Sequence, residues 1–339
     1  MASTAPRLQT TQVFNRIFWV KHLKKILIIG LISTMAGVVA GFNWLGIGAD
    51  FYNYQDYFDA ISLKGFSAVE SSRFEIGFGV LSWFFLVITD SNSLTWFLLV
   101  VIAISTKFSL LRINSYGFIL AALFYFTRFY PLYELVQLRV AIASGFVILA
   151  FLLQNKGMYY KASIAIAIGV TMHYSTLIFL PFLFTPINKK SIFLYIVGFI
   201  LLIFINSTSL VYQITPYFPS LTMYDTTGYG SKEVNPFSIA NILDLLFIAF
   251  SVVIWNKLTV IMKKAVIMLA FGITILWSMS EFQVIAHRFR EFLAIPVFIY
   301  VYESQKLKSS WAKIGVTAYV IACSIFYTIL YFYKEKIVT

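Results

Sequence analysis

Five arginines lie beside apolar runs, at positions that we expect on the outer side of a membrane: Arg73, Arg128, Arg139, Arg288 and Arg290. Outer segments of membrane proteins usually contain few lysines and arginines, because positive charge is retained on the cytoplasmic side. A guanidinium group offers a planar fork of donors that matches the oxygens of phosphate or carboxylate. Arginines at these positions therefore indicate that the protein holds an anion.

The most specific of these signals lies in residues 281–291. His287, Arg288 and Arg290 directly precede an apolar run that ends before Lys306. Two arginines at the end of a membrane segment predict a phosphate clamp. The alternative is a structural role, in which the arginines form ion pairs with the glutamates at the two ends of this segment.

A second arginine stands at the start of a predicted helix of small residues. This helix begins at Arg139, just after Gln137. Cations are electrostatically unfavourable at a helix N-terminus, whereas anions are favourable there. A bound anion would account for both the arginine and the exposed backbone amides. An ion pair with Glu134 is the alternative.

Carboxylates and aromatic rings occur together after the first apolar run. Asp50, Tyr54 and Tyr57 recur at helical spacing and can share one face of a helix. Aromatic rings stack on the C–H faces of sugars, and a carboxylate can accept a hydroxyl hydrogen bond or remove a proton. The pattern therefore predicts a saccharide site. An aromatic belt at the membrane interface, with solvated acids, is the alternative.

Glu75 stands at the start of the next apolar run. A carboxylate that enters a membrane segment is costly unless it is paired. Arg73, two residues before it, is the candidate structural partner. Gly77 follows and would permit close packing of helices.

His173 lies in a short polar patch, with Thr171 and Ser175, inside an apolar stretch. Ionisable residues within membrane segments are functional candidates by default. We therefore expect catalysis or substrate binding at His173, with a buried structural histidine as the alternative.

Motifs for metals and nucleotides are missing from the sequence. It contains no Gly-rich phosphate loop, HExxH, GxSxG or DxD pattern, a single cysteine (Cys323) and three dispersed histidines. We expect no metal and no cofactor, and a nucleotide-sugar enzyme with a soluble domain is disfavoured.

The composition shows which elements must position these residues. Hydrophobic residues make up 60% of the 339 residues and charged residues 12%, and the mean hydropathy is +0.83. Solid apolar runs recur along the chain, so we predict an all-α, polytopic helical integral membrane protein in contact with the lipid bilayer. The net charge of +12 comes largely from lysines between the runs, where they set topology, so it does not indicate nucleic-acid binding.

The lysine pairs between apolar runs define the expected sidedness. We predict a cytoplasmic tail at residues 1–25 without a cleaved signal peptide, one transmembrane catalytic domain at 26–333, and a C-terminal tail at 334–339. The expected outer loops cover about residues 44–75, 131–139, 207–237 and 281–290. Apolar runs are expected at about 26–43, 76–89, 94–111, 115–130, 135–153, 162–185, 191–206, 238–255, 265–280, 291–303 and 314–333.

Two regions disturb this alternation of sides. Residues 76–106 must cross an odd number of times, although they contain two runs, and residues 162–188 must cross out and back. We interpret both as broken or re-entrant helices, the second turning near His173, because irregular backbone at membrane depth is tolerated around a polar cavity. A different number of spans is the alternative, and the total is about 10–12.

The order of these patches resembles the EpsG family, the Wzy-like polysaccharide polymerases of bacterial inner membranes. The resemblance spans residues 48–290. Its matching pieces are Gly48-Ala49-Asp50 with Tyr54, Glu75 with Gly77, Leu138-Arg139 with Ala141 and Ala143, His173 with Ser175, and Arg288.

The resemblance implies a multi-pass, GT-C-like glycosyltransferase of the bacterial inner membrane. It would move a growing glycan from undecaprenyl diphosphate onto the non-reducing end of a new lipid-linked repeat unit, without a nucleotide sugar or metal. It also implies a flippase and a chain-length regulator of the same pathway as partners. The polymer would be an O-antigen, capsule or exopolysaccharide.

Roles for the candidate residues follow from this chemistry. Fixed arginines would stabilise the charge on the leaving diphosphate. We assign Arg139 and Arg288 to the diphosphate, with Arg290 and Arg128 as weaker candidates. Three groups compete as the base for the acceptor hydroxyl, with Asp50 preferred over Glu75 and His173. The expected substrate-binding residues are Tyr54, Tyr57, Gln137 and His287, and the loop 207–237 is a candidate lid or saccharide surface.

Two other functions remain open at this stage. A transporter or flippase of lipid-linked oligosaccharide would require charge on both sides of an alternating cavity. A ligase related to the O-antigen ligases would use the same donor and similar arginines, and only the acceptor would distinguish it.

Overall fold

The computed structural model describes residues 6–43, 49–113, 115–184, 237–279 and 283–331, together with the single positions 187, 197, 198 and 235. Every regular element within these residues is a helix. The expectation that the outer loop 207–237 forms a lid or saccharide surface falls almost entirely outside the described residues.

Within the described part of the chain, five helical segments are long and apolar enough to cross a membrane. They are His22–Gly41, Asn92–Ser109, Leu138–Asn155, Val260–Ser278 and Ser310–Ile329. The polytopic helical membrane fold predicted from the composition is therefore confirmed. Further apolar helices of 10–17 residues are Ile76–Thr89, Tyr174–Phe184 and Ile239–Val253.

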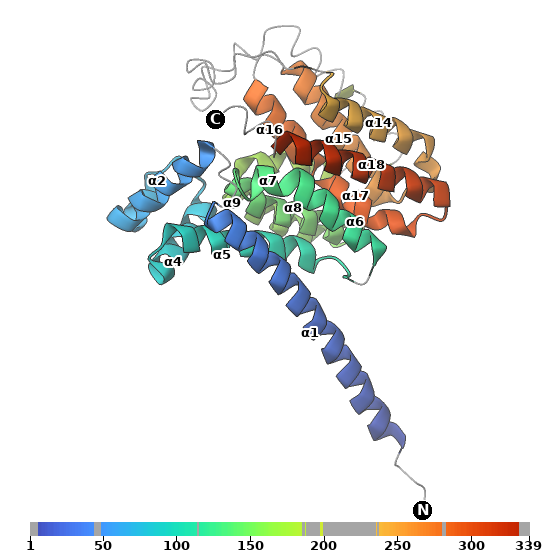
Figure 1. The fold of residues 1–339 in the computed structure, drawn as a ribbon, viewed down its shortest axis with the longest axis horizontal. Helices are drawn as coiled ribbons and strands as arrows, with labels where there is room; N and C mark the ends of the chain where they lie inside the picture. Colours follow the sequence, from blue (N-terminus) through green and yellow to red (C-terminus); the bar gives the residue numbers. More distant parts are fainter. Residues whose placement is uncertain are drawn as a thin grey trace, which may run out of the picture.

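The first helix, α1 (Pro6–Gly41), is 36 residues long and projects from the rest of the molecule toward the N-terminus (Figure 1). Its C-terminal half packs against α5 (Asn92–Ser109). Gly37 and Gly41 permit this contact, because a Cβ at either position would come within 3 Å of Phe97. The close approach buries one face of α1, while the opposite apolar face stays exposed, as expected for a helix that contacts lipid.

The N-terminal half of the described chain continues with short helices. After α1 come α2 (Ala49–Lys64), α3 (Phe66–Glu70), α4 (Ile76–Thr89), α5, α6 (Tyr116–Phe124), the π-helical turn η1 (Tyr125–Phe129) and α7 (Tyr130–Tyr133). Then follow α8 (Leu138–Asn155), α9 (Tyr159–Met172), the 3-10 helix η2 (Tyr174–Phe179) and α10 (Leu180–Phe184).

The C-terminal half packs around one buried helix. Its elements are α14 (Ile239–Val253), η4 (Trp255–Lys257), α15 (Val260–Ser278), α16 (Gln283–Ala294), α17 (Pro296–Glu303), η5 (Ser304–Lys306) and α18 (Ser310–Ile329). Every residue of α17 is buried, as expected for a central helix that is apolar on most sides.

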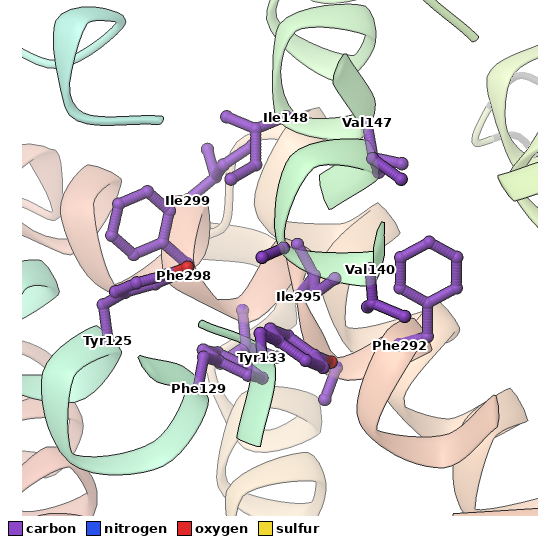
Figure 2. Packing of buried hydrophobic residues seen from close by; sticks show 14 of the residues in the cluster. Tyr125, Phe129, Tyr133, Val140, Val147, Ile148, Phe292, Ile295, Phe298 and Ile299 are labelled. Atoms are coloured by element: carbon purple, nitrogen blue, oxygen red, sulfur yellow. The ribbon is translucent and has the colours of Figure 1, made fainter. Parts of the chain in front are cut away.

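The core joins the two halves of the chain. Aromatic side chains of η1 and α7 meet α8, α16 and α17 there (Figure 2). The residues drawn at this junction include Tyr125, Phe129, Tyr133, Val140, Phe292, Ile295 and Phe298. The rings of Phe129 and Tyr133 stack at 5.5 Å. This packing fixes the N-terminus of α8 relative to α16, and each of these two helices carries one of the predicted diphosphate ligands.

Both breaks predicted from the sequence are present. The apolar stretch 76–106 forms two helices, separated at Asp90, which adopts a left-handed conformation with φ 48°. The stretch 162–188 breaks at His173, whose extended backbone (φ −160°, ψ 118°) ends α9 before η2 begins. With 14 residues, α4 has a length of about 21 Å, shorter than the bilayer core of about 30 Å.

Candidate active site

Five elements bring the predicted acids, the histidine and two arginines together. Asp50 lies in the first turn of α2, and Glu75 is the residue before α4. Arg139 lies in the first turn of α8, His173 separates α9 from η2, and Arg288 lies on α16. Four of them lie at a helix end or at a break between helices, and Arg288 lies within the 12-residue helix α16.

Glu75 is the acceptor at the centre of this group. Its Oε2 accepts a hydrogen bond from Nη1 of Arg139 at 2.7 Å. Its Oε1 lies 2.9 Å from Nδ1 of His173 and accepts the backbone N–H of Tyr174 at 3.1 Å. The expected pairing of Glu75 with Arg73 is wrong, because the guanidinium of Arg73 lies over the ring of Phe74 instead. The carboxylate is thus compensated by groups more than 60 residues away in the sequence.

The protonation states follow from these contacts. Burial alone would raise the pKa of Glu75, but the hydrogen bond from His173 and the charge of Arg139 lower the pKa to about 2. At neutral pH the carboxylate of Glu75 is therefore ionised.

The contact with Glu75 leaves a neutral imidazole of His173 with one available tautomer. An ionised carboxylate only accepts hydrogen bonds, so Nδ1 of His173 must carry the proton that it donates to Glu75. Nε2 then carries the lone pair. A carboxylate that fixes the tautomer of a histidine in this way prepares the other ring nitrogen to accept a proton.

Arg139 is held from three sides. Its Nε donates to the hydroxyl of Tyr54 at 3.3 Å, and Nη1 donates to Glu75. Its guanidinium lies 4.5 Å from the centroid of the Phe74 ring, which stacks on Tyr54 at 5.4 Å. The alternative pairing of Arg139 with Glu134 is wrong, because Glu134 is buried and accepts from Lys107 at 2.8 Å. The arginine side chain remains 22% exposed.

The second arginine forms a more open pair. Nη2 of Arg288 lies 2.9 Å from Oδ2 of Asp50, and the two side chains are 37% and 28% exposed. The ring of His173 lies 6.0 Å from the ring of Phe292, one helical turn after Arg288 on α16, so this pair and the Glu75 group lie in one site. The described residues of the site thus include two guanidiniums, two carboxylates and one imidazole, all partly exposed except for the buried carboxylate of Glu75.

Close packing of α4 against α9 sets the distance between Glu75 and His173. A Cβ at Gly77 would lie 2.4 Å from Oγ1 and 2.8 Å from the carbonyl oxygen of Thr171. The packing role predicted for Gly77 is therefore confirmed. Because Glu75 is two residues before Gly77 and His173 is two residues after Thr171, the contact between the helices brings these two predicted site residues together.

The other predicted site residues take several positions. Tyr57 is buried beside the ring of Phe74, with 4.4 Å between the centroids. Gln137 is the N-cap of α8, one turn from Tyr133, whose carbonyl accepts its N–H. His287 is half-buried on α16, next to Arg288. Tyr54 is the one predicted aromatic in direct contact with a site arginine.

Arg128 and Arg290 lie in a different environment from Arg139 and Arg288. Both are buried, and both donate to the carboxylate of Asp244. Asp244 was not predicted from the sequence. A single acid within the apolar run 238–255 is itself a signal, because an ionisable group in a membrane segment requires a partner. Among the described residues, no group of three or more histidine, cysteine, aspartate or glutamate side chains has the arrangement of a metal site.

Of the comparisons with known proteins, the one with protein families gives a match. Curated proteins and solved structures give no match. The model of the EpsG family matches residues 26–338, from the first span to the last residue but one. That match includes all the residues of the site described above. The chain therefore belongs to the EpsG family.

Proposed function

We propose that this protein is a polysaccharide polymerase of the bacterial inner membrane. It would transfer a growing glycan from undecaprenyl diphosphate onto the non-reducing end of a new lipid-linked repeat unit. The EpsG family is one of Wzy-like polysaccharide polymerases, and this membership supports a glycan-polymerising membrane enzyme. The lipid-linked oligosaccharide is the substrate in this proposal, and a flippase and a chain-length regulator of the same pathway are its protein partners.

One observation carries the proposal: two partly exposed arginines from distant parts of the chain each pair with a carboxylate, and one of these carboxylates, Glu75, also holds Nδ1 of His173. In the transfer, the bond between the anomeric carbon and the diphosphate oxygen breaks, and a bond to the acceptor hydroxyl oxygen forms. The diphosphate departs with its electron pair and gains charge in the transition state. Arg139 and Arg288 would stabilise that charge, as fixed cations do in electrostatic catalysis.

The acceptor hydroxyl must also lose its proton. Nε2 of His173 is the best-suited acceptor in the site, because Glu75 holds Nδ1 in its protonated form. Glu75 itself is a poor base, since its pKa is lowered to about 2. Asp50, preferred on sequence grounds, is the second candidate, although its Oδ2 accepts from Arg288 and its Oδ1 accepts from Asn53 at 3.4 Å. We therefore propose His173 as the base and Glu75 as the group that orients both His173 and Arg139.

Conservative replacement of the arginines tests the proposal. Purified protein in proteoliposomes is supplied with lipid-linked repeat units extracted from the source cells, and the products are separated as a polymer ladder. Arg288→Lys and Arg139→Lys should lose long-chain polymer while single units persist, because lysine keeps the charge but not the fork of donors. Arg112→Lys is a matched control, since the contact of Arg112 described here uses its backbone N–H, which donates to Tyr302.

The same assay separates the other functions. If Arg288→Lys or Arg139→Lys, present at the wild-type level, produces full-length polymer, that residue does not hold the diphosphate. Movement of the lipid-linked unit across the vesicle membrane without elongation would identify a transporter. Transfer to an acceptor other than a second repeat unit would identify a ligase.

A further inference from the structure

A buried group of charged side chains, together with Tyr319, joins four helical elements: η1, α14, α16 and α18. The carboxylate of Asp244, on α14, accepts from Nη1 and Nη2 of Arg128 at 2.7 and 2.9 Å. It also accepts from Nη2 of Arg290 at 2.6 Å and from the hydroxyl of Tyr319 at 2.8 Å. Glu291 accepts from both arginines. The group thus contains two cations and two anions, which is the neutral balance that burial requires.

The two arginines of this group are unsuited to bind a substrate. Arg128 is 0% and Arg290 is 2% exposed. The three guanidinium nitrogens of Arg128 all donate to Asp244, Glu291 or Tyr319. A diphosphate could reach them only by displacing buried carboxylates, and removing one partner from a buried ion pair is strongly unfavourable. Their contacts indicate a role in holding helices together.

The group is connected directly to the helix that carries Arg288. Arg288 and Arg290 are two residues apart on α16, so their side chains leave the helix about 200° apart around its axis. One therefore faces Asp50 in the site and the other faces Asp244 in the core. The backbone of Arg290 also lies against α15, because a Cβ at Gly272 would be 3.1 Å from its carbonyl oxygen. The rotation of α16 about its axis is thus set by Arg290 and decides where Arg288 points.

We infer that Asp244 is a positioning residue for the transfer reaction: through Arg290 and Arg128 it fixes α16 so that Arg288 faces Asp50 and His173. This inference rests on the proposed function, in which Arg288 stabilises the leaving diphosphate. Asp244 touches no reacting atom in this scheme. Its effect on the reaction passes entirely through the direction of the Arg288 guanidinium.

A double-mutant cycle tests this role. Asp244→Asn keeps the shape of the side chain but removes the charge that orients the two arginines, and Tyr319→Phe removes one hydrogen bond to Asp244 while its ring keeps its stack on Phe247. Rates of elongation are measured with the full-length protein in proteoliposomes, in the wild-type and the Arg288→Lys background. Ser251→Ala is the matched control, because Ser251 is also buried on α14 but donates to Tyr300.

The expected effects are specific. In the wild-type background, Asp244→Asn should lower kcat about 100-fold, since a displacement of about 1 Å costs on this order, and Tyr319→Phe should lower it less. In the Arg288→Lys background, both should have effects of less than about threefold, because coupled residues are not additive. Ser251→Ala should leave the rate unchanged in both backgrounds.

Two results would overturn the inference. One is an equal loss from Asp244→Asn or Tyr319→Phe in both backgrounds, which would show a general structural effect. The other is a wild-type rate for both variants. If Asp244→Asn does not assemble, the cycle with Tyr319→Phe decides between these results. Failure of the proposed function is distinguishable, because the wild-type protein itself would then not elongate the lipid-linked units. Failure of the role of Arg288 alone would appear as normal elongation by Arg288→Lys.

Discussion

Replacement of Glu75 by glutamine perturbs the central acceptor of the site with the least change in shape. The glutamine oxygen can still accept from His173 and from the backbone of Tyr174. Its amide nitrogen, however, would face Nη1 of Arg139, which lies 2.7 Å from Oε2 of the glutamate. Two hydrogen-bond donors, the glutamine amide and Nη1 of Arg139, would then face each other. Arg139 would also lose its ion pair with Glu75.

The magnitude follows from the pKa of Glu75. The value of about 2 in the folded protein is below the ordinary 4.5, and each pH unit corresponds to about 1.4 kcal/mol. The ionised form thus stabilises the folded state by about 3 kcal/mol at neutral pH. This agrees with the loss of about 3–5 kcal/mol typical of a broken buried ion pair. For a chain of this size it lowers Tm by roughly 5 °C.

The pH dependence has a defined sign. Because the folded pKa of Glu75 is depressed, its stabilisation is fully present above about pH 4.5 and is lost as the pH falls toward 2. Thermal unfolding of purified protein in nanodiscs, followed between pH 7 and pH 3, should show this loss in the wild type. In Glu75→Gln the starting Tm should be lower and that part of the acid dependence should be missing.

A matched variant controls for the change of carboxylate to amide. Glu70→Gln makes the same replacement at an exposed position at the end of α3. Its Tm should stay within about 1 °C of wild type, because exposed substitutions usually change stability by less than 0.5 kcal/mol. Equal Tm values for Glu75→Gln and Glu70→Gln would refute the reasoning, and so would an unchanged acid dependence in Glu75→Gln.

Three further outcomes follow from the site. His173→Gln should lower the rate of elongation by about 10²–10⁴-fold, because general base assistance contributes on this order; a wild-type rate would contradict this assignment. Gly77→Ala should destabilise the protein by about 1–3 kcal/mol, because its Cβ would meet Thr171. Gly30→Ala is the control and should not destabilise it, because a Cβ there has nothing within 4 Å; equal unfolding temperatures of the two variants would refute this. EDTA should leave elongation by the purified protein unchanged, and inhibition that added divalent metal reverses would disprove a metal-free transfer.

Much of the fold was predictable because membrane helices are encoded locally. The apolar run expected at 76–89 coincides with α4 (Ile76–Thr89), and the run at 238–255 contains α14 (Ile239–Val253). The break at His173 was also predictable, since the lysines on both sides of that region required the chain to return. In each case the deciding information lay within about one helix length of the element concerned.

The partners of the site residues were not predictable in the same way. Sequence neighbours suggested Arg73 for Glu75 and Glu134 for Arg139. The structure instead joins Glu75 to Arg139, 64 residues away, and Arg288 to Asp50, 238 residues away. A single sequence shows which side chains require a partner, because isolated charge in an apolar stretch is unfavourable. It does not show which distant charge the packing of helices will supply.

Exposure, rather than residue type, separates the four arginines near the site. Arg128 and Arg290 are enclosed with Asp244 in a neutral group that no ligand can enter without separating buried charges. Arg139 and Arg288 have carboxylate partners as well, but their side chains remain 22% and 37% exposed. Arg288 and Arg290 stand on the same helix, α16. The backbone that carries Arg288 at the site is therefore also the backbone that Arg290 ties to Asp244 in the core. If Arg288 exchanges Asp50 for a diphosphate, as proposed, the helix that carries it must itself be held in place, and the ion pairs of Arg290 are the contacts that we infer to hold it.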